Sequence, residues 1–199
     1  AATDAAGENV RDIAKLQKGD KVTVTVTVPG GYAFTSAQVE LSFDKDRFEL
    51  GNGEDDFYPG FEPAFATGIG AKFWANSSMS GVSAANESGK AVVTANGAIQ
   101  NRTGTAVSEI EMAEQWTILT AVFTVKETAN LGSADFAITK ALFCHEVDGD
   151  KNTTYTVETP EAISATVVQE IDSVELTGSI TTPAKGTENK SKVTGNNVT

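Results

Sequence analysis

Two segments with a strict two-residue alternation, residues 22–28 and 36–43, constrain the fold of this chain more than any other feature. Valine and threonine alternate through the first segment, and apolar and polar residues alternate through the second. Successive side chains of a strand point to opposite faces, so each segment predicts a strand with one face in a core and one face in solvent. The expected inward side chains are Val22, Val24, Val26, Val28, Ala37, Val39, Leu41 and Phe43.

The charge of the chain narrows its possible partners. Its 199 residues fit one β domain and a tail, and 27 acidic against 15 basic residues give a net charge of −12. Such a chain is expected to repel nucleic acids and anionic membranes and to favour partners that are basic or carry metal ions. No apolar run approaches the roughly 20 residues of a membrane span. We take Ala1 as the boundary of a mature or shortened chain, so the lack of a signal peptide does not argue for the cytoplasm.

The order of several short motifs resembles a cohesin, the scaffoldin module that captures dockerins in cellulosome-type assemblies. Gly19-Asp20 opens the valine segment, Phe43-Asp44 closes the next one, and a turn leads to the short apolar step Phe48–Leu50. Four later segments continue the likeness: Gly89–Asn96, Leu119–Lys126, Ala137–Phe143 with the glycine turn after it, and Glu161–Val168, the last two being expected to form a hairpin. The likeness covers residues 8 to 170.

This resemblance implies an all-β jelly-roll sandwich of about nine strands with no catalytic activity. It implies binding to a dockerin-bearing protein outside the cell, secreted or attached to the cell surface. The chain itself is expected to need no cofactor, since calcium would belong to the dockerin. We expect a flexible N-terminus at residues 1–7, the sandwich at 8–172, and a linker rich in Thr, Gly, Asn and Lys at 173–199. A linker of this kind suggests a monomeric module within a larger chain.

Four segments lack the clear alternation of the two strands, and each has its own expected local structure. Glu8–Gln17 has apolar residues at helical spacing, whereas the resemblance implies a first strand, and both remain open. Residues 51–72 are expected to form a long connection in which Phe57, Phe61 and Phe65 close one end of the sandwich. Residues 82–88 are expected to be a turn. Val107–Gln115 is expected to form a short helical insertion, since Ser108 and Glu111 have the spacing of a capping box.

The resemblance also implies that one sheet face binds the dockerin, and the alternation identifies the outward side chains. The expected partner-binding residues are Ser36, Gln38, Glu40, Ser42, Trp74, Val92, Thr94, Asn96, Thr120 and Val122. In the best-known cohesin type, Asn and Asp stand where this chain has Ser36 and Gln38, which predicts a different class of dockerin. Glu40 is expected to meet a Lys or Arg of the partner. The alternative is that these residues form the polar face of any solvated sheet.

Two other non-catalytic functions compete with dockerin binding. A carbohydrate-binding module would stack sugars on a row of exposed, coplanar aromatic rings, for which the candidates are Trp74, Trp116, Tyr32 and Tyr58. A structural spacer or adhesin module would have the same sandwich with charged sheets that carry no discrete partner face.

Catalytic and metal sites find little support in the sequence. His145 is the one histidine and Cys144 the one cysteine, which are too few for a zinc site, and neither a nucleophile elbow nor a phosphate-binding loop is present. Cys144 is expected to be a buried thiol, because it follows an apolar run and its neighbour His145 would point to the opposite strand face. Asp148-Gly149-Asp150 begins like a calcium loop, but without the later glycine it favours a tight hairpin turn.

Overall fold

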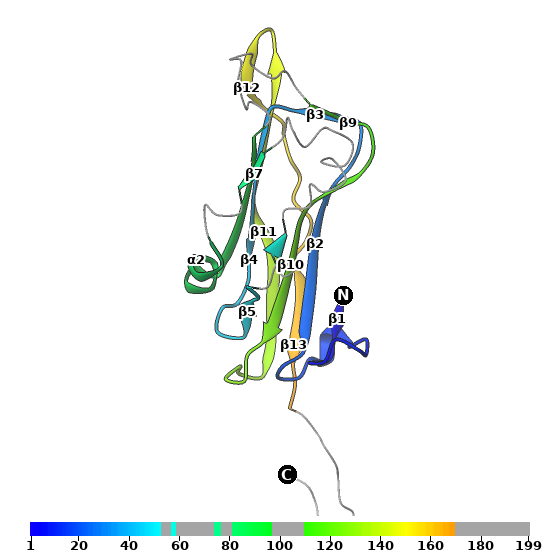
Figure 1. The fold of residues 1–199 in the computed structure, drawn as a ribbon, viewed down its shortest axis with the longest axis vertical. Helices are drawn as coiled ribbons and strands as arrows, with labels where there is room; N and C mark the ends of the chain where they lie inside the picture. Colours follow the sequence, from blue (N-terminus) through cyan, green and yellow to red (C-terminus); the bar gives the residue numbers. More distant parts are fainter. Residues whose placement is uncertain (53–56, 59–73, 77–80, 97–109, 170–199) are drawn as a thin grey trace, which may run out of the picture. The chain divides into compact units, whose positions relative to one another are not determined.

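Two antiparallel sheets packed face to face form the sandwich seen in the computed structural model (Figure 1). The structure describes residues 1–52, 57–58, 74–76, 81–96 and 110–169. The chain divides into two units, Ala1–Gln169 and Glu170–Thr199, and the sandwich is the first of them. The prediction of an all-β sandwich is therefore confirmed. Strands β1 to β13 exceed the expected nine because several of them have only two or three residues.

The first sheet is built around the valine segment. Its order is β1-β2-β10-β5, and β6 also pairs with β10. The bounds are Ala2–Thr3 for β1, Lys21–Val28 for β2, Phe48–Leu50 for β5, Phe57–Tyr58 for β6 and Trp116–Val125 for β10. The turn before β2 is fixed by Asp20, which is 1% exposed and accepts the backbone N–H of Gln17 at 2.8 Å. The Gly19-Asp20 opening of the motif thus has a structural function, to close the turn that starts β2.

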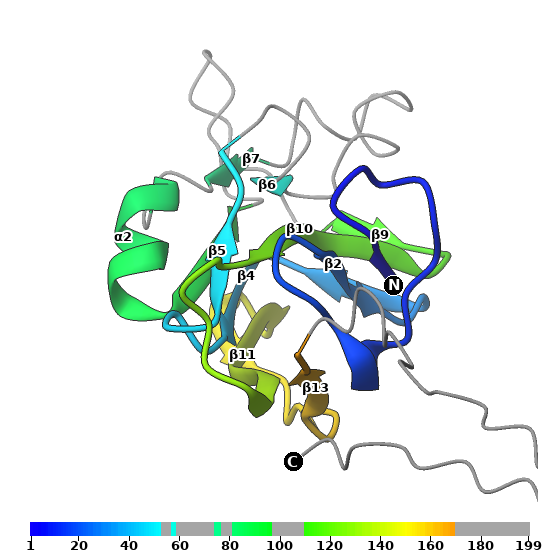
Figure 2. The ribbon, with the colours of Figure 1, turned by 90° about the horizontal axis from the view of Figure 1, so that it is seen from below.

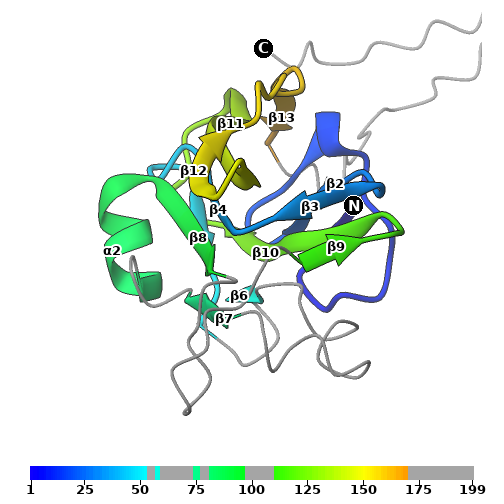
Figure 3. The same ribbon diagram turned by 90° about the horizontal axis from the view of Figure 1, so that it is seen from above.

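The second sheet has the order β12-β11-β4-β8-β7, and β13 also pairs with β11. Seen from above, these strands lie on one side of the sandwich and β2 and β10 on the other (Figure 3). The bounds are Ser36–Ser42 for β4, Trp74–Asn76 for β7, Lys90–Asn96 for β8, Gly132–Val147 for β11, Asp150–Thr154 for β12 and Ile163–Val167 for β13. β11 and β12 are joined at Asp148-Gly149, where φ is 51° and 86°. Two successive positive φ angles are typical of the tight hairpin turn that the sequence predicted.

The core lies between the two sheets and consists of the inward side chains that the alternation identifies. Val22, Val39, Leu41 and Phe123 are each 2% exposed or less. Three aromatic rings in contact, Phe43, Phe123 and Phe136, connect β10 to the opposite sheet, with centroids 4.7 and 5.0 Å from that of Phe123. Burial of these apolar side chains is the main favourable contribution to folding.

A short helix closes one side of the sandwich. Helix α2, Gly81–Ser88, contacts β8 of one sheet and β5 of the other, and Figure 2 shows it beside β5. The side-chain oxygen of Asn86 accepts the backbone N–H of Leu50 at 2.7 Å, and its amide group donates to the carbonyl oxygen of Leu50 at 3.0 Å. Asn86 therefore gives the edge of β5 the two hydrogen bonds that a further strand would provide. Ala85 of the same helix is fully buried.

The prediction of a short helix at Val107–Gln115 was wrong in its position. Residues 110–112 form strand β9, Ile110–Met112, which pairs with β3, Tyr32–Phe34, while residues 107–109 lie outside the described part of the chain. Pairing with β3 overrides the local capping signal. The helix lies instead at α2, where we expected a turn.

Expectations about the N-terminal residues, residues 8–17 and the last hairpin also need correction. Ala2 and Thr3 are not frayed, because they pair with β2 and Ala2 is 4% exposed. Residues 8–17 form neither a regular helix nor a strand: they contain the 3₁₀ turn η1, Ile13–Lys15, followed by one bridge from Leu16 to Val167. β13 pairs with residues 132–136 of β11 and does not form the expected hairpin with 137–143.

Phe61, Phe65 and the linker at 173–199 lie outside the described residues.

The Asn86→Ala substitution is expected to lower the free energy of unfolding by about 2 kcal/mol, since it leaves two backbone groups of Leu50 without their partner. Urea unfolding at neutral pH measures this loss. Ser83→Ala is the matched control, because Ser83 is exposed on the same helix, and its effect is expected to stay within about 0.5 kcal/mol. Equal stability of the two variants would contradict the role given to Asn86.

Candidate functional site

The outward face of β4 is the centre of the candidate site. β4 is paired along its whole length with β8 on one side and with β11 on the other. Ala37, Val39 and Leu41 point into the core and are 3%, 1% and 2% exposed. The alternating side chains therefore point away from the core, and all of them are half-buried: Ser36, Gln38, Glu40 and Ser42.

The strand register places these side chains in rows across three strands. Gln38 lies between Leu142 of β11 and Thr94 of β8, and Glu40 lies between Lys140 and Val92. Directly opposed residues of antiparallel strands share a face, so each row forms one contact surface. We call this surface the β4 face, and its members are Ser36, Gln38, Glu40, Ser42, Lys90, Val92, Thr94, Lys140 and Leu142.

Two apolar side chains on the β4 face do not belong to the core. Val92 alternates with the fully buried Ala91 and Val93, and Leu142 precedes the buried Phe143, so both point outward and are half-buried. Neither of them is part of the hydrophobic core cluster. The β4 face thus combines apolar, hydroxyl, amide and charged groups, a composition typical of protein-binding surfaces.

The charged end of the β4 face is organised around Glu40. Its Oε1 atom accepts hydrogen bonds from the Thr139 hydroxyl at 2.5 Å and from the Lys90 ammonium at 3.0 Å. Thr139 and Lys90 hold the pKa of Glu40 below its ordinary value, because both stabilise the charged carboxylate. Glu40 is therefore an anion at neutral pH that already has its partners within the chain.

The ten predicted site residues separate into three groups. The four β4 residues, Val92 and Thr94 lie together on the β4 face. Trp74 and Asn96 are paired with each other in the same sheet, but their side chains lie outside what the structure describes. Thr120 and Val122 point outward as expected, yet they lie on β10 in the opposite sheet, so the structure does not bring them to the β4 face. Alternation identifies the outward side chains of a strand, but the sheet to which the strand belongs depends on long-range pairing.

Three members of the β4 face were missed by the sequence reasoning. Lys90 was assigned only to the start of a strand, and Lys140 and Leu142 were not assigned to an outward face. Their alternation with Ala141 and Phe143 is visible in the sequence, but a bulge between Ile138 and Lys140 interrupts it.

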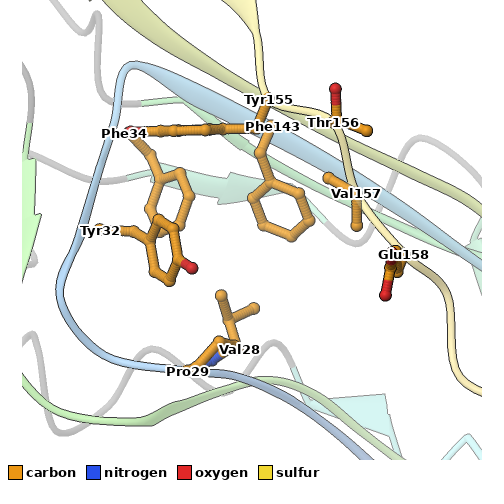
Figure 4. A pocket seen from close by; sticks show the side chains of 9 residues that line it. All are labelled: Val28, Pro29, Tyr32, Phe34, Phe143, Tyr155, Thr156, Val157 and Glu158. Atoms are coloured by element: carbon orange, nitrogen blue, oxygen red, sulfur yellow. The ribbon is translucent and has the colours of Figure 1, made fainter.

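A pocket lies at the end of the sandwich near β3 and β12. This pocket of about 200 Å³ is lined by aromatic and aliphatic side chains with Glu158 at its margin (Figure 4). The ring of Tyr155 lies at 87° to that of Tyr32, and its hydroxyl donates to the carbonyl oxygen of Ala33 at 3.0 Å. These rings contact one another and are not coplanar, so they do not form the flat row that a sugar-stacking site needs. The side chains of the other three sugar-stacking candidates, Trp74, Trp116 and Tyr58, lie outside the described part.

The remaining candidates for chemistry do not converge on one site. Cys144 is 7% exposed, as expected for a buried thiol, and His145 stacks on Tyr155 with ring centroids 4.0 Å apart. Within the described ranges, no three His, Cys, Asp or Glu side chains are grouped as a metal site. No helix in the described part has the length and apolar character that a membrane span requires.

The Glu40→Gln substitution is expected to lower the free energy of unfolding by about 1 kcal/mol at pH 7, because Gln lacks the charge that Lys90 and Thr139 stabilise. Since the folded state lowers the pKa of Glu40, this stabilisation is present above the ordinary carboxyl pKa and is lost as the pH falls through the lowered value. Urea unfolding at pH 7 and at about pH 3 measures the difference. Glu49→Gln, an exposed site on β5, is the control. A Glu40→Gln effect equal at both pH values would contradict this account.

Comparisons with known proteins support the fold. No family model and no curated protein sequence matches the chain. Among solved structures, the seventh ScaB type I cohesin of Pseudobacteroides cellulosolvens matches with a TM-score of 0.52 and 20% identity, over 81% of this chain and 92% of that one. A cohesin module from a Clostridium perfringens family 33 glycoside hydrolase matches with a TM-score of 0.47 and 15% identity, over 79% and 92%. The cohesin in a type I cohesin–dockerin complex from Clostridium thermocellum matches with a TM-score of 0.44 and 14% identity, over 78% and 94%.

The first of these matches spans most of both chains and agrees with the sandwich described above. At 20% identity it establishes the fold and not the partner. The chain therefore has the fold of a cohesin module, as the order of its sequence motifs predicted.

Proposed function

We propose that this chain is a non-catalytic module that binds a dockerin through the β4 face. The observation that carries the proposal is the position of Val92 and Leu142, two apolar side chains outside the core that flank the polar row of β4. The outer face of a solvated sheet is usually polar, so two apolar side chains beside the polar row of β4 favour a protein-binding surface over a plain spacer. The cohesin fold makes a dockerin the preferred partner.

Rigidity of the β4 face favours tight binding. Because β4 is hydrogen-bonded on both sides, the face is formed before the partner arrives, and little conformational entropy is lost on association. Calcium would be carried by the dockerin. Ser36 and Gln38 stand where the best-known cohesin type has Asn and Asp, so we assign this module a dockerin class of its own. A place in a cellulosome-type assembly outside the cell belongs to the same proposal.

Gln38→Arg is expected to weaken dockerin binding at least a hundredfold, because Gln38 is at the centre of the β4 face and a larger charged side chain there separates the two surfaces. Isothermal titration calorimetry against purified dockerins of the source organism, each measured with calcium and with a chelator, gives the affinity. Thr94→Arg, in the same row, is expected to act in the same way.

Thr25→Arg on β2 is the matched control, since Thr25 is exposed on the opposite sheet. It is expected to bind like the unmodified chain. Absence of calcium-dependent binding to every dockerin would overturn the proposed function. Binding that survives Gln38→Arg in a folded variant would show that the site lies elsewhere.

A further inference from the structure

The charged end of the β4 face has more positive than negative charge. Lys140 lies directly across from Glu40 on β11, and Lys90 reaches Glu40 from β8, so two ammonium groups surround one carboxylate. The ion pairs among the described residues include Lys90 with Glu40 but do not include Lys140, which is exposed. This local excess of one positive charge lies in a chain whose net charge is −12.

Glu40 is a poor contact for a basic partner residue. Its Oε1 atom already accepts both Thr139 and Lys90, and Lys140 adds a further attraction to the same carboxylate. A partner Lys or Arg that approached Glu40 would come close to both Lys90 and Lys140, and like charges at such a distance repel. The structure therefore does not favour the sequence-based expectation that Glu40 meets a basic residue.

We propose that the partner places a carboxylate on Lys140 and an apolar side chain against Leu142. This inference rests on the proposed function, because it specifies the chemistry of the dockerin surface that meets the β4 face. An Asp or Glu of the partner that approaches Lys140 gains an ion pair without breaking either hydrogen bond of Glu40. Its apolar neighbour covers Leu142, which has no place in the core.

The spacing of the two contacts fits a helix of the partner. Lys140 and Leu142 are two positions apart on one face of β11, which corresponds to about 7 Å along a strand. Side chains one turn apart on a helix are about 5–6 Å from one another. An amphipathic helix with an acidic residue three or four positions from a large apolar residue thus matches the Lys140–Leu142 pair.

Lys140→Glu is expected to weaken binding about tenfold or more, because it replaces an attraction with a repulsion. If Glu40 instead received a basic partner residue, the added carboxylate would strengthen binding, so the two arrangements predict opposite signs. Lys140→Gln is expected to weaken binding about threefold and to reduce its dependence on salt concentration. The probe is the calcium-loaded dockerin that binds the unmodified chain with highest affinity in calorimetry.

Lys15→Glu is the matched control, since it makes the same change in net charge at an exposed residue of η1, away from the β4 face. It is expected to leave the affinity unchanged. Leu142→Arg separates the two proposals. If it abolishes binding while Lys140→Glu does not weaken it, the acidic-partner inference fails and the proposed site stands. If Leu142→Arg has no effect, or if no dockerin binds, both proposals fail.

Replacing dockerin acids one at a time by Lys then identifies the partner residue. One such replacement is expected to weaken binding to the unmodified chain and to restore binding to Lys140→Glu at least fivefold. Circular dichroism and thermal unfolding of each variant exclude misfolding as the cause of a loss. Failure of every replacement to restore binding would overturn the pairing with Lys140.

Discussion

Pairing of β4 along both of its edges is the constraint on which the rest of the structure depends. Because β8 and β11 fix its register, Val39 and Leu41 face the core while Gln38 and Glu40 face outward. A slip of one residue would exchange these two sets, which would bury the carboxylate of Glu40 and expose two core side chains. The core and the β4 face are therefore specified by the same hydrogen bonds. A mutation that loosens β4 acts on stability and on recognition together.

The net charge of the chain and the charge of the β4 face have opposite signs. Which of the two acts on a partner group depends on the distance between that group and each charge. Charges separated by more than about 8 Å are largely screened at physiological salt concentration. A partner group in contact with Lys140 is therefore influenced mainly by Lys140, Lys90 and Glu40, and only weakly by the remaining acidic residues. The net charge of −12 affects solubility and long-range encounter, whereas the local arrangement governs affinity.

The sequence predicted those parts of the fold that depend on local periodicity. The alternation in β2 and β4 identified the core side chains, and Asp148-Gly149 identified a hairpin turn. Assignments that depend on long-range pairing failed: the capping signal at residues 108–111 did not prevent residues 110–112 from pairing with β3, and Thr120 and Val122 belong to the opposite sheet. In the candidate site, β4 and β8 supplied correct outward residues, whereas the bulge before Lys140 concealed the contribution of β11.

The order of the rows along β4 makes the β4 face directional. Ser36 lies at an uncharged end, Gln38 lies in the middle beside Leu142, and Glu40 lies at the end that Lys140 and Lys90 make positive. A helix that approached in the reverse direction would place its carboxylate near Ser36, where neither Lys140 nor Lys90 can neutralise it, so the cost of desolvating that carboxylate would not be offset. The same asymmetry disfavours helices that lack an acidic residue at the matching position. Orientation and partner choice therefore have one physical origin, the unequal distribution of charge along a rigid strand.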